Sequence, residues 1–310
     1  MRVIISGGTG VIGRVLVRDL AAEGHEVIVL SRDPDAVSDF PEQVRVEKWD
    51  AHSTDGWGHL VDGAGAVVNL AGESISGGAL LPKRWTDARK QRIRDSRVNA
   101  GKAIVLAVEA AQHKPGVVIQ ASAVGYYGSR GDEQLSEDAN AGHDFLAKTT
   151  AEWEQSTEAL DTMGVRRCVI RIGVVLTTKG GALPSMMLPF KLFVGGPLGH
   201  GKQWVPWIHI DDVSGAIRYL IENEDTSGIY NLTAPNPLQN RDFAKQLGAA
   251  MRRPSFVPMP SFVFKTMFGE VATIVLDGQR AVPQRLQEAN YEFKFPDAQS
   301  ALNHLLKQRA

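Results

Sequence analysis

The chain has 310 residues, of which 43% are hydrophobic, so it is long enough for one large or two ordinary domains. Its formal net charge of −1 excludes a global positive field that would attract nucleic acid or anionic lipid. The single cysteine, Cys168, excludes an internal disulfide and a thiolate metal cluster, which predicts a cytoplasmic protein. No apolar run reaches about 18 residues, and the first apolar stretch is too short for a signal peptide, so neither a membrane span nor export is expected.

Short β-branched runs alternate with longer helical patterns over the first part of the chain, and most runs are apolar on both faces. This pattern predicts a doubly wound parallel sheet, because parallel strands are buried on both faces and right-handed crossovers place helices on each side. The predicted strands are residues 3–6, 26–30, 44–48, 66–71, 116–122, 166–176 and 228–233. The predicted helices include residues 11–23, which end at Gly24, and a long helix from Pro82 to residue 112.

A glycine-rich turn, GGTGVIG at residues 7–13, follows the first predicted strand and opens the first predicted helix. Such a turn lets the backbone approach a pyrophosphate, and the free N–H groups and dipole of the helix N-terminus favour the anion. Its position predicts dinucleotide binding, against the alternative of a purely structural turn. The expected contacts are Gly7, Gly8, Thr9, Gly10, Val11, Ile12 and Gly13.

The end of the second predicted strand, VIVLSRDP, bears on the type of cofactor. NAD-binding proteins place an Asp or Glu here to accept from the ribose 2′-OH. Ser31 and Arg32 instead offer a hydroxyl and a guanidinium, which suit a 2′-phosphate. The pair predicts NADP(H) over NAD(H). The alternative is an ordinary exposed arginine at the start of a loop, with Asp33 opposing the preference.

Further segments are expected at the same site. Asp50 follows the third strand within reach of the adenine, with a turn or cap role as the alternative. The residues that end the fourth strand would let the backbone approach the cofactor, and they are Leu70, Ala71 and Gly72. Residues 83–97 carry seven basic and two acidic side chains, which a solvated helix face explains. Arg97 of this helix is expected to turn inward to the cofactor phosphates.

The composition changes after residue 176. Glycines and prolines crowd residues 180–202 around one short predicted helix. A strand, an N-cap at Asp211 or Asp212 and a helix follow, and Asp297 caps a closing helix. The predicted division is an NADP-binding Rossmann domain at 1–175 plus 205–233, and a smaller, mostly helical, substrate-side domain at 176–204 plus 234–310.

These motifs resemble the extended short-chain dehydrogenase/reductases, also called the NAD-dependent epimerase/dehydratase family. More narrowly, the chain is similar to an atypical branch of nucleoside-diphosphate-sugar-epimerase-like proteins with a C-terminal domain of unknown function. The resemblance covers nearly the whole chain and is carried by GGTGVIG, NLAGESI, SAVGYYG, DFLAKTTAEWE, RIGVVLTTKGGAL, GGPLGHGKQWVPWIHIDDV, NLTAPNP and GQRAVPQRLQEANYEFKFP. It implies a two-domain fold, NADP(H) in the Rossmann cleft, and a substrate pocket between that cleft and the C-terminal part.

The resemblance also reveals a departure. Ordinary members of that family hold a Ser or Thr after the fifth strand and Tyr-x-x-x-Lys on the next helix. Ser122 matches the first role and Lys148 matches the lysine, whereas Asp144 stands where the tyrosine would be. An aspartate with a pKa of about 3.9 is already ionised at neutral pH and is a poor proton donor. A pairing of Asp144 with Lys148 on an exposed helix face explains both residues without chemistry.

The substitute proton donor is expected in SAVGYYG. Tyr126 and Tyr127 follow Ser122 in the loop that leaves the fifth strand, at the sheet edge where α/β proteins place ligands. One tyrosine of this pair, with Ser122, is predicted to polarise a substrate carbonyl. The spacing does not decide which tyrosine turns inward, and the alternative role of both is packing.

Three weaker signals lie in and after the sixth predicted strand. Arg171 and Val175 are expected to flank the nicotinamide ribose, with a buried structural ion pair as the alternative for Arg171. In HIDDV, His209 is expected to be a packed strand residue, and no metal site is predicted because the histidines lack metal-ligand spacing. Lys202 in GGPLGHGKQW would bind an anionic substrate group or lie in a lid loop.

The sequence therefore predicts an NADP(H)-dependent oxidoreductase or epimerase-like enzyme that transfers hydride on a small carbonyl, alcohol or sugar-derived substrate. The alternative is an NADP(H)-binding sensor or scaffold without catalysis. A nucleic-acid binder that uses residues 83–97 is a weaker alternative because the net charge is near zero. The expected partner is a small-molecule substrate, with no nucleic acid or membrane, and the chain is expected to be a monomer or homodimer.

Overall fold

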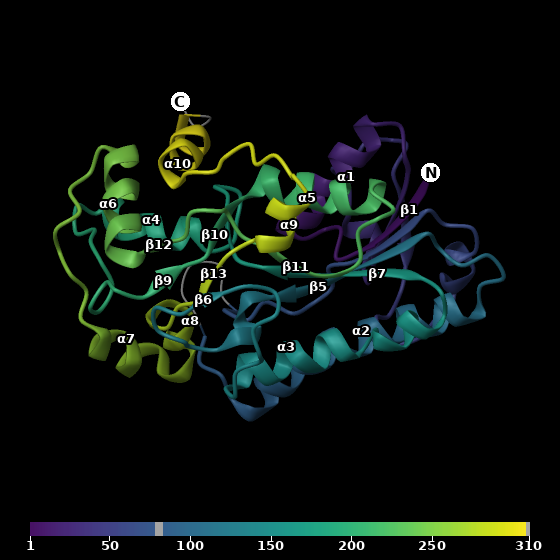
Figure 1. Ribbon diagram of the computed structural model, residues 1–310, viewed down its shortest axis with the longest axis horizontal. Coiled ribbons are helices and arrows are strands. Elements are labelled where there is room, and N and C mark those ends of the chain that lie inside the picture. The colour runs from purple at the N-terminus through teal and green to yellow at the C-terminus, as the bar shows by residue number, and fades with distance from the viewer. Residues whose placement is uncertain (78–82, 308–310) are drawn as a thin grey trace.

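The computed structural model describes residues 1–77 and 83–307, and its centre is a seven-stranded parallel sheet (Figure 1). The strand order is β11-β7-β5-β4-β1-β2-β3. The strands are β1 (Arg2–Ser6), β2 (Glu26–Ser31), β3 (Arg45–Lys48), β4 (Ala66–Asn69), β5 (Val117–Ala123), β7 (Arg166–Ile172) and β11 (Gly228–Leu232). This is the doubly wound Rossmann arrangement, so the predicted fold class is confirmed.

Helices cover both faces of the sheet (Figure 1). α1 (Val11–Ala22) and α5 (Ile210–Glu222) pack side by side on one face. α2 (Asp87–Ala110) and α3 (Phe145–Gln155) pack together on the other. The alternation of β1 shows how one strand serves both layers, since Val3 and Ile5 join one apolar core and Ile4 joins the other.

The long helix α2 begins later than its pattern predicts. Thr86 is its N-cap, and the Thr86 hydroxyl accepts a hydrogen bond from the Arg89 N–H at 3.3 Å. The predicted start, Pro82, lies outside the described residues. α1 ends as predicted, because Gly24 follows it with a left-handed φ of +82°.

The predicted strand 166–176 is two strands. After β7, the chain leaves the main sheet at Gly173, and β8 (Val174–Leu176) pairs with β10 (Trp207–His209). A Cβ at Gly173 would lie 2.1 Å from the carbonyl oxygen of Pro206, so only glycine permits this close approach. Because the apolar run is continuous in sequence, its pattern does not predict that the strand ends at Ile172.

The predicted N-cap of α5 at Asp211 or Asp212 is wrong. His209 is the N-cap, and its Nδ1 accepts from the Asp211 N–H at 3.0 Å. The Asp212 carboxylate instead accepts from the backbone N–H groups of Lys294 and Phe295, at 2.7 and 3.0 Å. Asp212 therefore joins α5 to the C-terminal segment.

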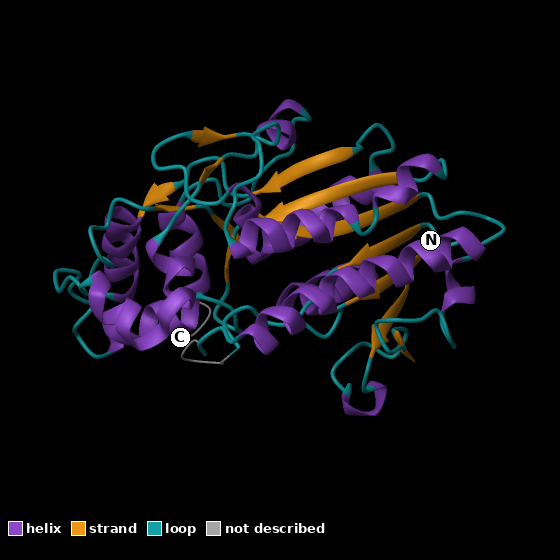
Figure 2. Cartoon of the chain, turned by 90° about the horizontal axis from the view of Figure 1, so that it is seen from below, coloured by secondary structure: helices purple, strands orange, loops and turns teal. Residues whose placement is uncertain are grey.

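A mainly helical part lies beyond the carboxyl ends of the strands (Figure 2). α4 (Leu183–Lys191), α6 (Asn240–Met251) and α10 (Ala298–Lys307) share an apolar core there. As predicted, Asp297 caps α10, where its carboxylate accepts from the Ser300 N–H at 2.9 Å. The shorter elements are β6 (Gln134–Leu135), β9 (Trp204–Val205), β12 (Leu238–Gln239), α7 (Ser261–Phe268), α8 (Thr273–Leu276), β13 (Arg280–Ala281) and α9 (Gln284–Glu288).

The two-domain division at the boundaries given above stays a prediction. Among the described residues, none of the helices has both the length and the apolar character needed to span a membrane.

Candidate functional site

The glycine turn between β1 and α1 forms one wall of a cleft of about 470 Å³, which we call the glycine cleft. The Gly10 N–H donates to the Gly7 carbonyl at 3.0 Å and closes the turn. A Cβ at Gly13 would lie 2.4 Å from the Gly7 oxygen, and a Cβ at Gly8 would lie 2.8 Å from the Val29 side chain. Only glycine allows the turn, helix and sheet to approach so closely. None of the described side chains caps the start of α1, so the first N–H groups of this helix are free for an anion.

The ends of β2 and β4 supply the other walls of the glycine cleft. Arg32 is exposed there, and no hydrogen bond or ion pair joins its side chain to another residue in the described part of the chain. The Ser31 hydroxyl accepts from the Asp33 N–H at 3.2 Å. The predicted contacts that line the cleft are Gly7, Thr9, Gly10, Ser31, Arg32, Leu70, Ala71 and Gly72.

The other predicted cofactor contacts lie elsewhere. Gly8 and Gly13 pack inside the turn, whereas Val11 and Ile12 pack against the apolar core of the C-terminal helices. Asp50 is a turn residue, because its carboxylate accepts hydrogen bonds from the backbone N–H groups of His52 and Ser53, each at 2.7 Å. These backbone hydrogen bonds hold the pKa of Asp50 below its usual range.

The sequence reasoning missed Arg14, a second guanidinium in the glycine cleft. Its Nε donates to the Thr9 carbonyl at 2.8 Å, and its NH1 pairs with Asp39. Arg14 lies on the first turn of α1, directly after the glycine motif. The sequence shows that Arg14 is next to the glycine motif, but it does not show that the side chain points into the cleft.

A second cavity, of about 270 Å³, lies beside the glycine cleft and is lined mostly by apolar side chains; we call it the apolar cavity. Arg97 lies between the two spaces. It lines the apolar cavity, and its Cζ would lie 3.1 Å from a Cβ placed on Gly72, which lines the glycine cleft. Arg97 NH1 donates to the carbonyls of Glu73 and Ile93, at 3.0 and 2.9 Å. Burial lowers the pKa of Arg97 to about 10, so it is still charged at neutral pH.

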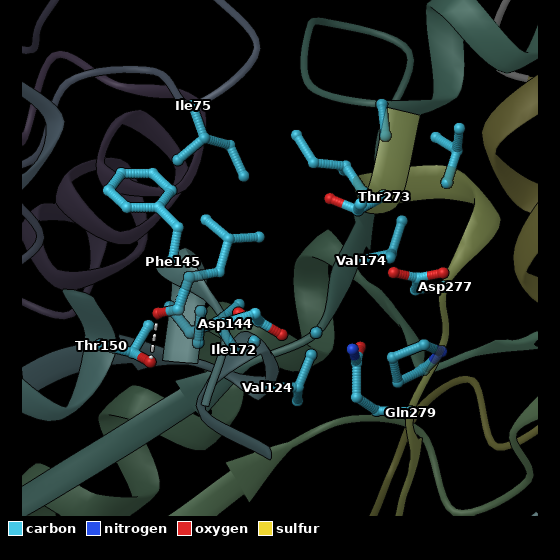
Figure 3. A pocket seen from close by; sticks show the side chains of 18 of the residues that line it. Ile75, Val124, Asp144, Phe145, Thr150, Ile172, Val174, Thr273, Asp277 and Gln279 are labelled. Atoms are coloured by element: carbon cyan, nitrogen blue, oxygen red, sulfur yellow. Dashed lines mark hydrogen bonds between the residues drawn. The ribbon is translucent and has the colours of Figure 1, made fainter. Parts of the chain in front are cut away.

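Three acidic residues, Asp144, Glu270 and Asp277, interrupt the apolar walls, and Figure 3 labels Asp144 and Asp277. Asp144 is the N-cap of α3, and its Oδ1 accepts from the Ala147 N–H at 2.8 Å. Asp277 follows α8 on another wall. Withdrawal from water raises the pKa of Asp277; the charge of Lys265 opposes this rise and the charge of Asp144 adds to it.

Two predicted catalytic residues, Ser122 and Tyr127, belong to a buried polar network rather than to the apolar cavity. Ser122 Oγ donates to Glu154 Oε1 at 2.6 Å, and Glu154 binds the Arg171 guanidinium through both oxygens, at 2.8 and 2.9 Å. Arg171 NH1 donates to Tyr127 Oη at 3.1 Å, and Tyr127 Oη donates to Asn231 Oδ1 at 2.7 Å. Arg171 therefore forms a buried structural ion pair, which was the alternative to a position beside the nicotinamide ribose.

The other two predicted catalytic residues, Tyr126 and Lys148, form no hydrogen bonds to that network within the described chain. Tyr126 lies with its ring centroid 3.5 Å from Arg171 Cζ, and its hydroxyl makes no hydrogen bond within the described chain. Lys148 is exposed on α3. The predicted side-chain pair of Lys148 with Asp144 is wrong: no ion pair joins them within the described chain, and the Asp144 carboxylate instead caps the helix by accepting from the Ala147 N–H. Val175 packs in the core, and its neighbour Val174 lines the apolar cavity.

Two other sequence signals have structural roles. His209 is buried, as predicted, and both ring nitrogens have protein partners, since Nδ1 accepts from Asp211 and Nε2 lies 3.1 Å from Nδ1 of His304. Burial lowers the pKa of His209 to about 3, so it is neutral at physiological pH. Lys202 is exposed and does not line the apolar cavity.

The basic residues of 83–97 bind largely to their own chain. Arg84 donates to backbone carbonyls of α7, Lys90 pairs with Glu270 at 2.5 Å, and Arg94 pairs with Glu152. These contacts tie α2 to neighbouring segments. They favour a structural role for the charges of this helix.

Known proteins are similar to this chain in sequence over nearly its whole length. Residues 3–233 match the NAD dependent epimerase/dehydratase family, and residues 259–305 match a domain of unknown function (DUF1731). Epimerase family protein SDR39U1 of Mus musculus is 37% identical over 309 residues, with 99% of this chain and 100% of that protein covered. Epimerase family protein YfhF of Bacillus subtilis is 36% identical, with 100% and 99% covered.

A crystal structure of human epimerase family protein SDR39U1 with NADPH has a TM-score of 0.87 and 34% identity, and 99% of each chain is covered. The nucleoside-diphosphate sugar epimerase of Corynebacterium glutamicum has a TM-score of 0.78 and 34% identity, with 99% of this chain but 58% of that chain covered. The resemblance inferred from the motifs is confirmed: the chain belongs to the NAD dependent epimerase/dehydratase family.

Proposed function

We propose that this chain is an NADP(H)-dependent oxidoreductase or epimerase-like enzyme that acts on a small carbonyl, alcohol or sugar-derived substrate. One observation carries the proposal: a cleft suited to a diphosphate adjoins an apolar cavity suited to a small substrate, and Arg97 lies between them. Bound NADP(H) supplies or accepts a hydride. The chain positions the substrate and excludes water from it.

The residues of the glycine cleft suit NADP(H). The turn from Gly7 to Gly13 offers free backbone N–H groups to the pyrophosphate. Arg32 has no protein partner within the described chain and is available to a 2′-phosphate, with the Ser31 hydroxyl beside it. The NADPH in the crystal structure of the human relative supports the same cofactor here.

The catalytic roles of Ser122, Tyr126, Tyr127 and Lys148 stay predictions, as do the cytoplasmic location and the monomeric or homodimeric state. Ser122 and Tyr127 already use their hydroxyls inside the fold. This observation favours a second candidate function, an NADP(H)-binding sensor without catalysis. Tyr126 is the tyrosine of the pair whose hydroxyl is still available.

Calorimetric titration with NADPH, NADP+, NADH and NAD+ tests the cofactor. We expect the two phosphorylated forms to bind more tightly, and an absence of heat with all four would contradict the proposal. A screen for NADPH consumption over aldehydes, ketones and nucleotide sugars then separates the two candidates. Tight cofactor binding without turnover of any compound in the screen favours the sensor.

A further inference from the structure

The size and lining of the apolar cavity narrow the class of substrate, and this inference rests on the function proposed above. Its volume of about 270 Å³ is below the range of roughly 300–1,000 Å³ that is typical of sites for drug-sized ligands. Ile75, Trp85, Phe145 and Val174 are among its apolar walls. The cavity therefore suits a compact and largely apolar molecule.

The charges in the cavity are mostly negative. The Asp277 carboxylate has no hydrogen bond or ion pair with any residue of the described chain, and Asp144 uses only Oδ1 to cap α3. Figure 3 shows both side chains among those that surround the cavity. Glu270 also lines it, but Lys90 pairs with Glu270 at 2.5 Å. Two exposed carboxylates therefore line the cavity without an ion pair to any residue of the described chain.

The positive charge that lines the cavity within the described chain is already engaged by backbone carbonyls. Arg97 is the cationic side chain among the described lining residues, and it donates to two backbone carbonyls. Residues 78–82 carry no charged side chain in the sequence. Lys265 and His200 act on Asp277 from positions that do not line the cavity. A diphosphate in this space would meet two carboxylates and lack the guanidinium or ammonium partners that phosphates need.

We propose that the substrate is a compact carbonyl compound or alcohol that carries a protonated amine, which the Asp144 and Asp277 carboxylates bind, and that it is not a nucleoside-diphosphate sugar. Both side chains are exposed to solvent along the wall of a mostly apolar cavity. A cation bound beside them relieves the repulsion that Asp144 exerts on Asp277 and gains charge-assisted hydrogen bonds. The amine is a recognition group and takes no part in hydride exchange.

The test uses calorimetry on the full chain saturated with NADP+. The probes are cyclohexylamine, cyclohexanol, cyclohexanecarboxylate and UDP-glucose. We expect cyclohexylamine to bind at least about tenfold more tightly than cyclohexanol, which corresponds to one charge-assisted hydrogen bond. We expect no heat from cyclohexanecarboxylate or UDP-glucose.

Variants locate the binding site. D277N should weaken cyclohexylamine binding about tenfold and leave cyclohexanol binding unchanged. D144N should act in the same direction without loss of the helix cap, because asparagine caps helices as well as aspartate. D225N makes the same charge change at an exposed position between α5 and β11, and it should leave both affinities unchanged.

The inference is overturned if cyclohexanecarboxylate or UDP-glucose binds at least as tightly as cyclohexylamine, if cyclohexylamine does not bind, or if D277N and D144N match D225N. NADP+ binding is measured first, in a separate titration. Failure of that titration contradicts the proposed function itself. Normal NADP+ binding with a negative amine result contradicts only the substrate class.

Discussion

The glycine cleft and the buried polar network lie at the same end of the sheet, but their polar groups are in opposite states. In the glycine cleft, the N–H groups at the start of α1 and the Arg32 guanidinium have no partner within the described chain. In the network, the Ser122 and Tyr127 hydroxyls are fully engaged by other side chains. Free polar groups favour ligand binding, whereas paired buried groups stabilise a fold. Substitutions in the two regions should therefore affect different quantities.

The largest effect is expected for Glu154→Ala in the network. Arg171 has a side chain only 1% exposed, and Glu154 is its bidentate partner. Removal of one partner from a buried ion pair costs about 3–5 kcal/mol of folding free energy, because the other charge is left uncompensated. Urea denaturation measures this loss. Glu133→Ala, which removes an exposed partner of Arg130, should cost about 0–1 kcal/mol; equal losses for both variants would contradict the assignment.

Gly13→Ala should act on the glycine cleft instead. Its Cβ would lie 2.4 Å from the Gly7 carbonyl oxygen, so the turn must open. We expect NADPH affinity to fall by about 100-fold, or about 2.8 kcal/mol, in calorimetric titration. Alanine favours a helix over glycine, so a weaker helix does not explain the loss. Gly24→Ala at the other end of α1 is the control, because an added Cβ there would meet no atom of the described chain within 4 Å. The left-handed φ of +82° at Gly24 means that alanine should lower stability but leave NADPH affinity unchanged.

The difference between the regions also explains what the sequence predicts well. The glycine cleft depends on a strand, a turn and a helix that are contiguous, and on the ends of neighbouring parallel strands. Each of these is a local pattern whose position in the sheet follows from chain order. The sequence therefore identified the turn, Ser31, Arg32 and the residues after β4. It missed Arg14, because helix periodicity does not fix the direction of a side chain next to a turn.

The apolar cavity depends on the facing direction of side chains and on contacts between distant segments, and no local sequence pattern predicts either. Ser122 and Ala123 are adjacent on β5, and strand alternation turns Ala123 towards the cavity and Ser122 towards Glu154. The sequence identifies this strand but not its facing direction. Asp277 comes from a segment distant in sequence from α3, and only the tertiary fold brings it to the same cavity as Asp144.

Arg32→Ala should distinguish the two phosphorylation states of the cofactor. Loss of a charge-assisted contact to the 2′-phosphate should lower NADPH affinity by about 30-fold, or about 2 kcal/mol, while NADH affinity stays the same. Calorimetric titration of both cofactors measures the difference. Arg45→Ala removes an exposed arginine at the start of β3 and is the matched control. Equal losses for NADPH and NADH in Arg32→Ala would assign Arg32 to a general electrostatic role.

The smallest effect is expected for Tyr126→Phe, and its comparison with Tyr127→Phe separates the two roles of the tyrosine pair. Tyr127→Phe leaves Asn231 Oδ1 without its donor in a fully buried position, which should cost about 1–3 kcal/mol in urea denaturation. Tyr126→Phe should change stability by less than about 0.5 kcal/mol, because its hydroxyl has no partner within the described chain. Turnover on an active substrate then assigns the chemistry. A loss of turnover in Tyr126→Phe at unchanged stability would make Tyr126 the catalytic hydroxyl. Unchanged turnover in both variants would leave the pair with packing alone, since neither hydroxyl would then take part in proton transfer.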